Sequence, residues 1–193
     1  MLPLLAAWET SRVSVLVSHA DRDHCSALAR IATRVQVESW AGPPPRDCGV
    51  TLPSTTHAAH PESGRTTWDL ANGTRLVFEK PRVGHDNEAS ASLWIERAGE
   101  RLLLTGDAEG DALDELVDRL EGSDPLTLLL LPHHGSDGPH FGRLLDAARP
   151  REVWVSASRL PVTRWELERR GLTWRCTARD GPLRFEGLPG PSE

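Results

Sequence analysis

The sequence contains few of the residues that build disulfide or thiolate scaffolds. Only three of its 193 residues are cysteines, namely Cys25, Cys48 and Cys176, and no two of them form a Cys-x-x-Cys pair. An odd number of scattered cysteines indicates neither a disulfide framework nor a thiolate zinc site. We therefore expect a reduced, cytoplasmic setting.

Long apolar runs and a basic leader are also missing. The longest apolar run is far short of a bilayer span, so we expect no membrane segment. The apolar N-terminus is followed by Glu9 and has no basic leader, which predicts a helix packed on the core rather than a signal peptide. A hydrophobic content of 38% in a chain of this length predicts one globular domain, residues 1–193.

Lysine is nearly absent, and the charge is unevenly distributed. Lys80 is the only lysine, and the net charge of −6 argues against non-specific nucleic-acid binding as the main role. Residues 86–124 hold twelve acids and three arginines, whereas residues 143–184 hold ten arginines and five acids. The arginine excess is either coding bias or a guanidinium-rich rim that binds phosphates.

Hairpins early in the chain and strand–helix alternation later predict an α/β fold with helices outside the sheet faces. Asn72-Gly73 predicts a hairpin between residues 68–70 and 74–79, and a second hairpin joins 90–96 to 101–105. We expect a long loop over 41–65 and a disordered tail over 187–193. The other predicted strands are 13–18, 35–40, 126–131, 152–156, 172–177 and 183–185, and the predicted helices are 25–33, 111–120, 141–148 and 162–170.

Three segments place metal-capable side chains directly after apolar strands. His133-His134 follows the run Leu126–Leu131, and Asp107 follows Leu102–Leu104. His19-Ala20-Asp21-Arg22-Asp23-His24 follows the first strand and carries four such side chains in six residues. The alternative interpretations are a solvated turn for the last segment and a helix N-cap for Asp107.

These segments, in this order, resemble the metallo-β-lactamase superfamily. More narrowly, they resemble the hydrolase domain at the C-terminus of ComEC-type DNA-internalisation competence proteins. The stretches that carry the resemblance are Ser18–His24, Asn87-Glu88-Ala89-Ser90, Leu103–Asp107 and Leu131–Ser136. The resemblance implies an αββα sandwich and a metal-dependent hydrolase.

The resemblance also implies a site that holds two divalent ions, zinc or manganese. The implied ligands are His19 and Asp21 at one ion, Asp23, His24 and His134 at the other, and Asp107 as a bridge. His133 would face the substrate as a general acid or oxyanion stabiliser, and with Asp23 it is an expected catalytic residue. His85 is either a further ligand or a polar residue beside a turn.

The remaining histidines have no expected role in this site. His57 and His60 fall in the long loop and are expected to be solvated, and His140 is expected at the start of a helix.

Two close cations can activate a water and clamp both oxygens of an in-line displacement, which suits a phosphodiester such as nucleic acid. Asp21 makes the site harder and more anionic, which favours manganese without excluding zinc. Two alternatives remain: a hydrolase of small esters or lactones, and a truncated, catalytically silent module that binds a partner.

The resemblance includes one departure at the N-terminus. Members of the superfamily normally begin with strands and a glycine-rich turn, and no such segment stands before Val13. We therefore expect the fold to lack part of its N-terminal sheet. Three interpretations remain for this departure: the chain is a fragment or has a misassigned start, a homo-oligomer or a partner chain covers the open sheet edge, or the fold tolerates an exposed edge.

Overall fold

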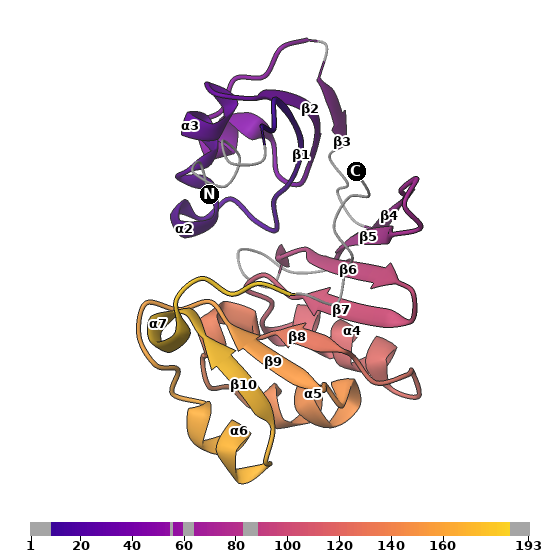
Figure 1. The fold of residues 1–193 in the computed structure, drawn as a ribbon, viewed down its shortest axis with the longest axis vertical. Coiled ribbons are helices and arrows are strands. Elements are labelled where there is room, and N and C mark those ends of the chain that lie inside the picture. The colour runs from indigo at the N-terminus through magenta and orange to yellow at the C-terminus, as the bar shows by residue number, and fades with distance from the viewer. Residues whose placement is uncertain (1–8, 55, 60–63, 83–88, 186–193) are drawn as a thin grey trace. The chain divides into compact units, whose positions relative to one another are not determined.

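The computed structural model describes residues 9–54, 56–59, 64–82 and 89–185. The chain forms two compact units, an N-terminal unit over residues Met1–Glu62 and a C-terminal unit over Ser63–Glu193. Each unit has its own β-sheet (Figure 1). The prediction of a single domain over residues 1–193 stays a prediction.

The N-terminal unit is built on a three-stranded parallel sheet. Its strands are β1 (Arg12–Leu16), β2 (Gln36–Ala41) and β3 (His57–Ala59), in the order β1-β2-β3. Helices α2 (Arg22–Cys25) and α3 (Leu28–Ala32) and the 3₁₀ helix η1 (Pro45–Cys48) connect them. A small apolar core contains buried side chains at Val17, Cys25, Val37, Trp40, Cys48 and Val50.

Cys25 and Cys48 form a disulfide, with their Cα atoms 5.0 Å apart. The expectation that the cysteines form no disulfide is therefore wrong. No local pattern indicated the pair, because 23 positions separate the two residues. Packing of α2 against η1 in the small core is what brings them together. Cys176 is a free, buried thiol.

The C-terminal unit is built on a seven-stranded mixed sheet in the order β10-β9-β8-β7-β6-β5-β4. Strands β4 (Gly64–Asp69), β5 (Arg75–Lys80), β6 (Ser92–Arg97) and β7 (Glu100–Leu104) pair antiparallel. Strands β7, β8 (Leu128–Leu130), β9 (Glu152–Val155) and β10 (Thr173–Cys176) pair parallel. The parallel strands require crossover connections, which the intervening helices supply.

Helices α4 (Gly110–Leu120) and α5 (Phe141–Ala148) pack against the sheet of the C-terminal unit. Their apolar faces meet inward-facing side chains of six strands, β5 to β10, in one core cluster. The fully buried members include Val117, Leu120, Leu144, Leu103, Leu129 and Val153. Burial of each leucine contributes about 1.5–3 kcal/mol. This core fixes the strand ends from which the candidate site residues extend.

The structure confirms both predicted hairpins. The turn at Asn72-Gly73 joins β4 to β5, and the backbone N–H of Thr74 donates to Asn72 Oδ1 over 3.0 Å. The side chain of asparagine thus replaces a backbone acceptor in the turn. The turn at Ala98-Gly99 joins β6 to β7, with the register Arg97↔Glu100.

Several predicted boundaries differ from the structure. The expected loop 41–65 contains η1 and β3, and the expected helix 25–33 is divided into α2 and α3. Helix α6 begins at Arg164 and ends at Arg169, two residues later at its start than predicted. Residues 183–185 form no strand, and the short helix α7 (Thr177–Asp180) follows β10 directly.

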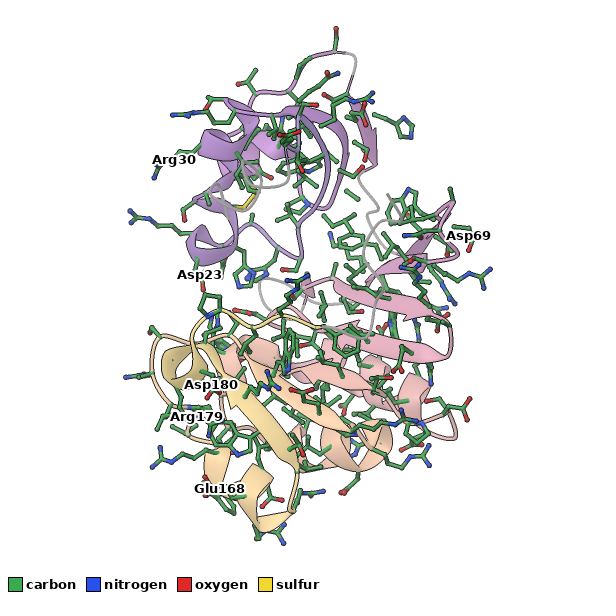
Figure 2. All side chains as sticks on the ribbon, in the orientation of Figure 1. Asp23, Arg30, Asp69, Glu168, Arg179 and Asp180 are labelled. Carbon is green, nitrogen blue, oxygen red and sulfur yellow. A yellow bond between two sulfur atoms is a disulfide. The ribbon has the colours of Figure 1, made fainter. Side chains whose placement is uncertain are left out.

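Local polar contacts stabilise helix α7. Hydrophobic periodicity, on which the predicted elements rest, does not reveal such contacts. Asp180 Oδ2 accepts from the Cys176 backbone N–H over 2.8 Å, and the Asp180 carboxylate pairs with Arg179 over 2.9 Å. Figure 2 shows Arg179 and Asp180 side by side. The guanidinium also lies over the ring of Trp174, 4.1 Å from its centroid. A charged segment therefore folds into a helical turn instead of extending into a strand.

The expected N-terminal helix and the expected tail over 187–193 fall outside the described residues. Among the residues that are described, no helix is both long and apolar enough to span a membrane.

Candidate metal centre

Four of the predicted ligands form one group after β1 of the N-terminal unit, with His19 and Asp21 in the loop and Asp23 and His24 in α2. His19 Nε2 lies 3.6 Å from Asp21 Oδ2, and His24 Nε2 lies 3.8 Å from Asp23 Oδ2. The two imidazole rings approach to 4.1 Å between centroids. This arrangement pairs the four side chains as the sequence predicts, and ligation itself stays a prediction.

Local backbone geometry explains how six residues bring these side chains together. Asp21 is the extended residue before α2, and its carbonyl accepts from the backbone N–H groups of His24 and Cys25. The chain therefore turns directly after β1 and continues into a helical turn. His24 is placed beside His19 by that turn. His19 is buried, whereas the carboxylates of Asp21 and Asp23 are more than half exposed.

Ser18 is a residue of this group that sequence reasoning missed. Its hydroxyl lies 3.0 Å from Nδ1 of His19 and 3.3 Å from Nδ1 of His24. A hydroxyl has one hydrogen to donate and two lone pairs, so it can serve both rings. With both Nδ1 atoms beside Ser18, the Nε2 atoms are left next to the carboxylates. The only sequence signal was the position of Ser18, directly before His19.

Asp107 occupies a buried position after β7 in the C-terminal unit. Its side chain is only 6% exposed, and its backbone N–H donates to Ser90 Oγ over 3.0 Å. The N-cap interpretation of Asp107 is wrong, because α4 begins at Gly110 and its N-cap position is Glu109. A buried carboxylate at a strand end is costly unless a cation or hydrogen bonds compensate its charge.

His133 and His134 lie in a tight turn, Pro132–Gly135, directly after β8. His133, His134 and Gly135 have φ of +44°, +56° and +76°, which is the left-handed region. Two non-glycine residues in this region cost about 1–3 kcal/mol each, a strain typical of functional sites. The His133 N–H donates to the Gly106 carbonyl over 3.2 Å, so the turn is tied to the loop that carries Asp107.

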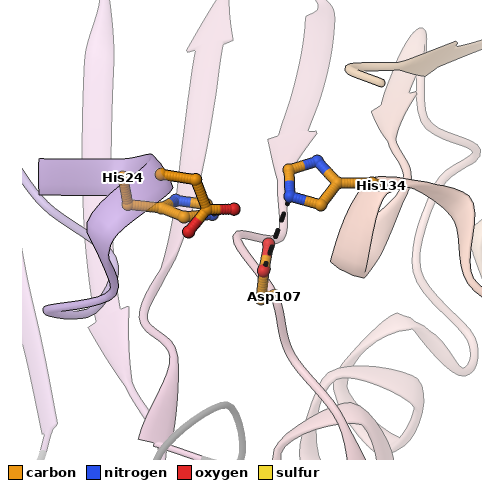
Figure 3. Close-up of side chains that lie close together, drawn as sticks. His24, Asp107 and His134 are labelled. Carbon is orange, nitrogen blue, oxygen red and sulfur yellow. Dashed lines mark ion pairs between the residues drawn. The ribbon is translucent and has the colours of Figure 1, made fainter. Parts of the chain in front are cut away.

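His134 is held with one defined nitrogen toward Asp107. Its Nδ1 lies 2.6 Å from the Ser156 carbonyl, and because a carbonyl only accepts, Nδ1 carries the hydrogen. Its Nε2 lies 3.8 Å from Asp107 Oδ2, as Figure 3 shows. Histidines that bind metals use this arrangement, in which a backbone carbonyl fixes the tautomer and the other nitrogen coordinates.

His133 is oriented by Glu109, a second residue that sequence reasoning missed. His133 Nδ1 makes a close hydrogen bond to Glu109 Oε1, and both side chains are partly exposed. The carboxylate accepts from Nδ1, which leaves Nε2 of His133 to act on another group. The only sign of Glu109 in the sequence was its position two residues after Asp107. Its contact with His133 forms because the turn after β8 directs His133 toward it.

The other predicted histidines have separate outcomes. His140 lies at the N-cap position of α5, as predicted, with its Nδ1 2.7 Å from Asp114 Oδ1. His57 is the first residue of β3 rather than part of a loop. His85 and His60 lie outside the described residues, as do Asn87 and Glu88.

The chain matches a protein family and two curated proteins over most of its length. The model of the metallo-beta-lactamase superfamily matches residues 13–159. The competence protein ComA of Neisseria gonorrhoeae is 30% identical over 158 residues, which cover 81% of this chain. ComE operon protein 3 of Bacillus subtilis is 24% identical over 170 residues, which cover 82% of it. The chain spans only 22% of the length of each relative.

Two solved structures share the fold. A mutant CmlA beta-hydroxylase has a TM-score of 0.57 at 14% identity, covering 86% of this chain and 43% of the hydroxylase. The metallo hydrolase Igni18 of Ignicoccus hospitalis has a TM-score of 0.52 at 16% identity, covering 84% of this chain and 75% of that protein. These similarities confirm the α/β metallo-beta-lactamase-like fold. With the family match over residues 13–159, the chain belongs to the metallo-beta-lactamase superfamily and is distantly similar to ComEC-type competence proteins.

Proposed function

We propose that the chain is a metal-dependent hydrolase that cleaves phosphodiester bonds, with a nucleic acid as its substrate. The observation that carries the proposal is the pairing of His134 with Asp107. One imidazole nitrogen is occupied by the Ser156 carbonyl, and the other lies 3.8 Å from a buried carboxylate. An imidazole whose tautomer a backbone carbonyl fixes, beside a buried carboxylate, offers the kinds of donor that divalent metal sites use.

The donors fit zinc or manganese. The proposed ligands are His19, Asp21, Asp23, His24, Asp107 and His134, with His85 as a further candidate. This set contains nitrogen and carboxylate oxygen donors and no thiolate, so it suits zinc and is hard enough for manganese. Two bound cations would supply Lewis acidity and an activated water.

The residues of the chain contribute positioning and proton transfer. Glu109 holds Nδ1 of His133, so Nε2 of His133 can donate a proton to the departing oxygen. Asp23, more than half exposed beside His24, can both ligate and orient the attacking water. The left-handed turn fixes His133 and His134 in different directions, with their ring planes at 64°. One histidine can therefore hold a metal while the other faces substrate.

Two features favour a phosphodiester over a small ester or lactone. Ten arginines lie within residues 143–184, and guanidinium groups bind phosphate oxygens in a bidentate manner. One curated relative is named competence protein ComA, which agrees with the resemblance of the sequence to DNA-internalisation competence proteins. Neither feature is needed for hydrolysis of an uncharged lactone.

The test is a comparison of metal content and activity in the purified chain. We expect up to two manganese or zinc ions per chain and hydrolysis of bis-(p-nitrophenyl) phosphate and single-stranded DNA. Asp107→Ala should lose metal and activity together. Glu109→Gln should keep the metal. Its kcat should fall about 10²-fold or more, because Glu109 orients His133, the residue proposed to transfer a proton. Asp111→Asn, on the exposed start of α4, is the matched control.

The panel also includes lactones. A chain that binds no metal after reconstitution would refute the proposal. Hydrolysis of lactones with no phosphodiester cleavage would assign the site to the ester and lactone class instead.

A further inference from the structure

An exposed apolar segment of the C-terminal unit runs from the loop after β9 into the first turn of α6. Leu160, Val162 and Trp165 are 43%, 62% and 57% exposed. They are three of the four large hydrophobic side chains found exposed among the residues that the structure describes. Their clustering within six residues is unusual, because exposed apolar side chains are normally scattered singly.

The segment has a defined conformation, because alternate residues anchor it. Pro161 and Thr163 are buried between the exposed residues. Thr163 Oγ1 donates to the Gly135 carbonyl over 2.8 Å, and a Cβ on Gly135 would stand 2.8 Å from Pro161 Cβ. Leu160 and Val162 are therefore held outward, and the segment is attached directly to the turn that carries His134.

Two arginines on the same segment carry charge that no neighbour neutralises. Arg159 and Arg164 are exposed, and within the described part of the chain neither forms an ion pair. The acid nearest to Trp165 in sequence, Glu166, is already paired with Arg169 and Arg170. A locally cationic apolar surface thus lies on a chain whose net charge is −6.

We propose that this segment, residues 159–165, is a binding surface for single-stranded nucleic acid. A tryptophan presents a flat face on which a base can stack, and flanking arginines can contact the phosphates on either side. The two exposed arginines complement phosphates and the exposed tryptophan complements bases, and a nucleic-acid strand carries both. The surface rests on the proposed function, since it would deliver a strand to the site beside His134.

The test measures strand binding without catalysis. An oligothymidylate end-labelled with fluorescein is titrated with the full chain in EDTA, and Kd is followed by fluorescence anisotropy. We expect Trp165→Ala to raise Kd about tenfold or more, because stacking of one base is lost. Trp165→Phe should restore most of the affinity, since phenylalanine retains an aromatic face. Arg164→Ala should lower the slope of log Kd against log salt by about 0.7, the value for one lost phosphate contact.

Arg151→Ala is the matched control. Arg151 is also exposed and its loss changes the net charge equally, but it precedes β9, at the opposite end of that strand from Ser156. It should leave the Kd unchanged. Equal Kd values for Trp165→Ala and the wild type would overturn the surface. So would absence of strand binding by the wild type, or loss of self-association in Trp165→Ala, which would make the patch an interface between copies.

Different measurements would refute the proposed function and the proposed binding surface. The proposed function fails if the wild type loaded with metal does not hydrolyse bis-(p-nitrophenyl) phosphate, a substrate too small to need the surface. The surface fails on Kd values measured in EDTA, where no hydrolysis occurs.

Discussion

Single residues determine the geometry of the turn after β8. Gly135 has φ +76°, and a Cβ there would stand 2.8 Å from Pro161 Cβ and 3.0 Å from Val155 Cγ1. Real Cβ atoms essentially never show the first of these distances, and the second is tighter than nine in ten real Cβ contacts. The orientation of His134 depends on the backbone at Gly135, because the two residues are adjacent in one turn.

Gly135→Ala is expected to lower the free energy of unfolding by about 2 kcal/mol or more, through left-handed strain and overpacking. Urea unfolding followed by circular dichroism measures the change. Gly138→Ala is the control, since a Cβ at Gly138 meets nothing within 4 Å. Equal losses for both variants would contradict the steric argument.

At the scale of elements, helix α6 is attached to α5 by an ion-pair network. Arg170 pairs with Asp146 of α5 and also donates to Glu166 over 2.5 Å. Hydrogen bonds from Arg169 and then Arg170 lower the pKa of Glu166 from its ordinary 4.5 to about 2. The carboxylate is therefore ionised in the folded state well below the pH at which it protonates in the unfolded chain.

The lowered pKa of Glu166 makes the stabilisation by its ion pairs with Arg169 and Arg170 depend on pH. Its stabilising contribution is fully present above pH 4.5 and is lost as the pH falls toward 2. Glu166→Gln should therefore be less stable than the wild type at neutral pH, and the gap should narrow between pH 4.5 and 2. Urea unfolding at several pH values measures the gap. Glu168→Gln, at an exposed position of the same helix, should show no such narrowing.

The disulfide joins two elements of the N-terminal unit, α2 and η1. Closing a loop of 23 residues stabilises a fold by about 3 kcal/mol through the entropy of the unfolded chain. The reduced setting expected from the number of cysteines stays a prediction.

Cys48→Ser is expected to lower the stability of the N-terminal unit by about 3 kcal/mol under non-reducing conditions. Thiol titration of the denatured wild type should find one free thiol, that of Cys176, before reduction. Reduced wild type should match the variant in stability. Three free thiols before reduction would show that the disulfide does not form.

At the scale of the whole molecule, metal binding links folding to the proposed function. A cation that binds only the folded chain stabilises it by about 2.7 kcal/mol at a hundredfold excess over Kd. Manganese or zinc should therefore raise Tm, and EDTA should reverse the rise. Differential scanning fluorimetry measures this shift. His134→Ala should remove it, because Nε2 of His134 lies beside Asp107; a rise of the same size in His134→Ala would exclude His134 as a ligand.

The sequence alone determined the class of fold and the segments that carry the site. Apolar runs followed by polar residues predicted the ends of β1, β7 and β8 to within two residues, and Asn72-Gly73 predicted a hairpin that the structure confirms. These signals are local, since periodicity and turn chemistry act over a few residues.

Only the tertiary structure decided the contacts between distant segments. The Cys25–Cys48 disulfide, the hold of Glu109 on His133 and the bond of Thr163 to Gly135 each join residues at least 23 positions apart. No local pattern contains such pairs, because they arise from the packing of strands and helices around the two cores. The same packing decided that Asp107 is a buried carboxylate beside His134 and not a helix cap.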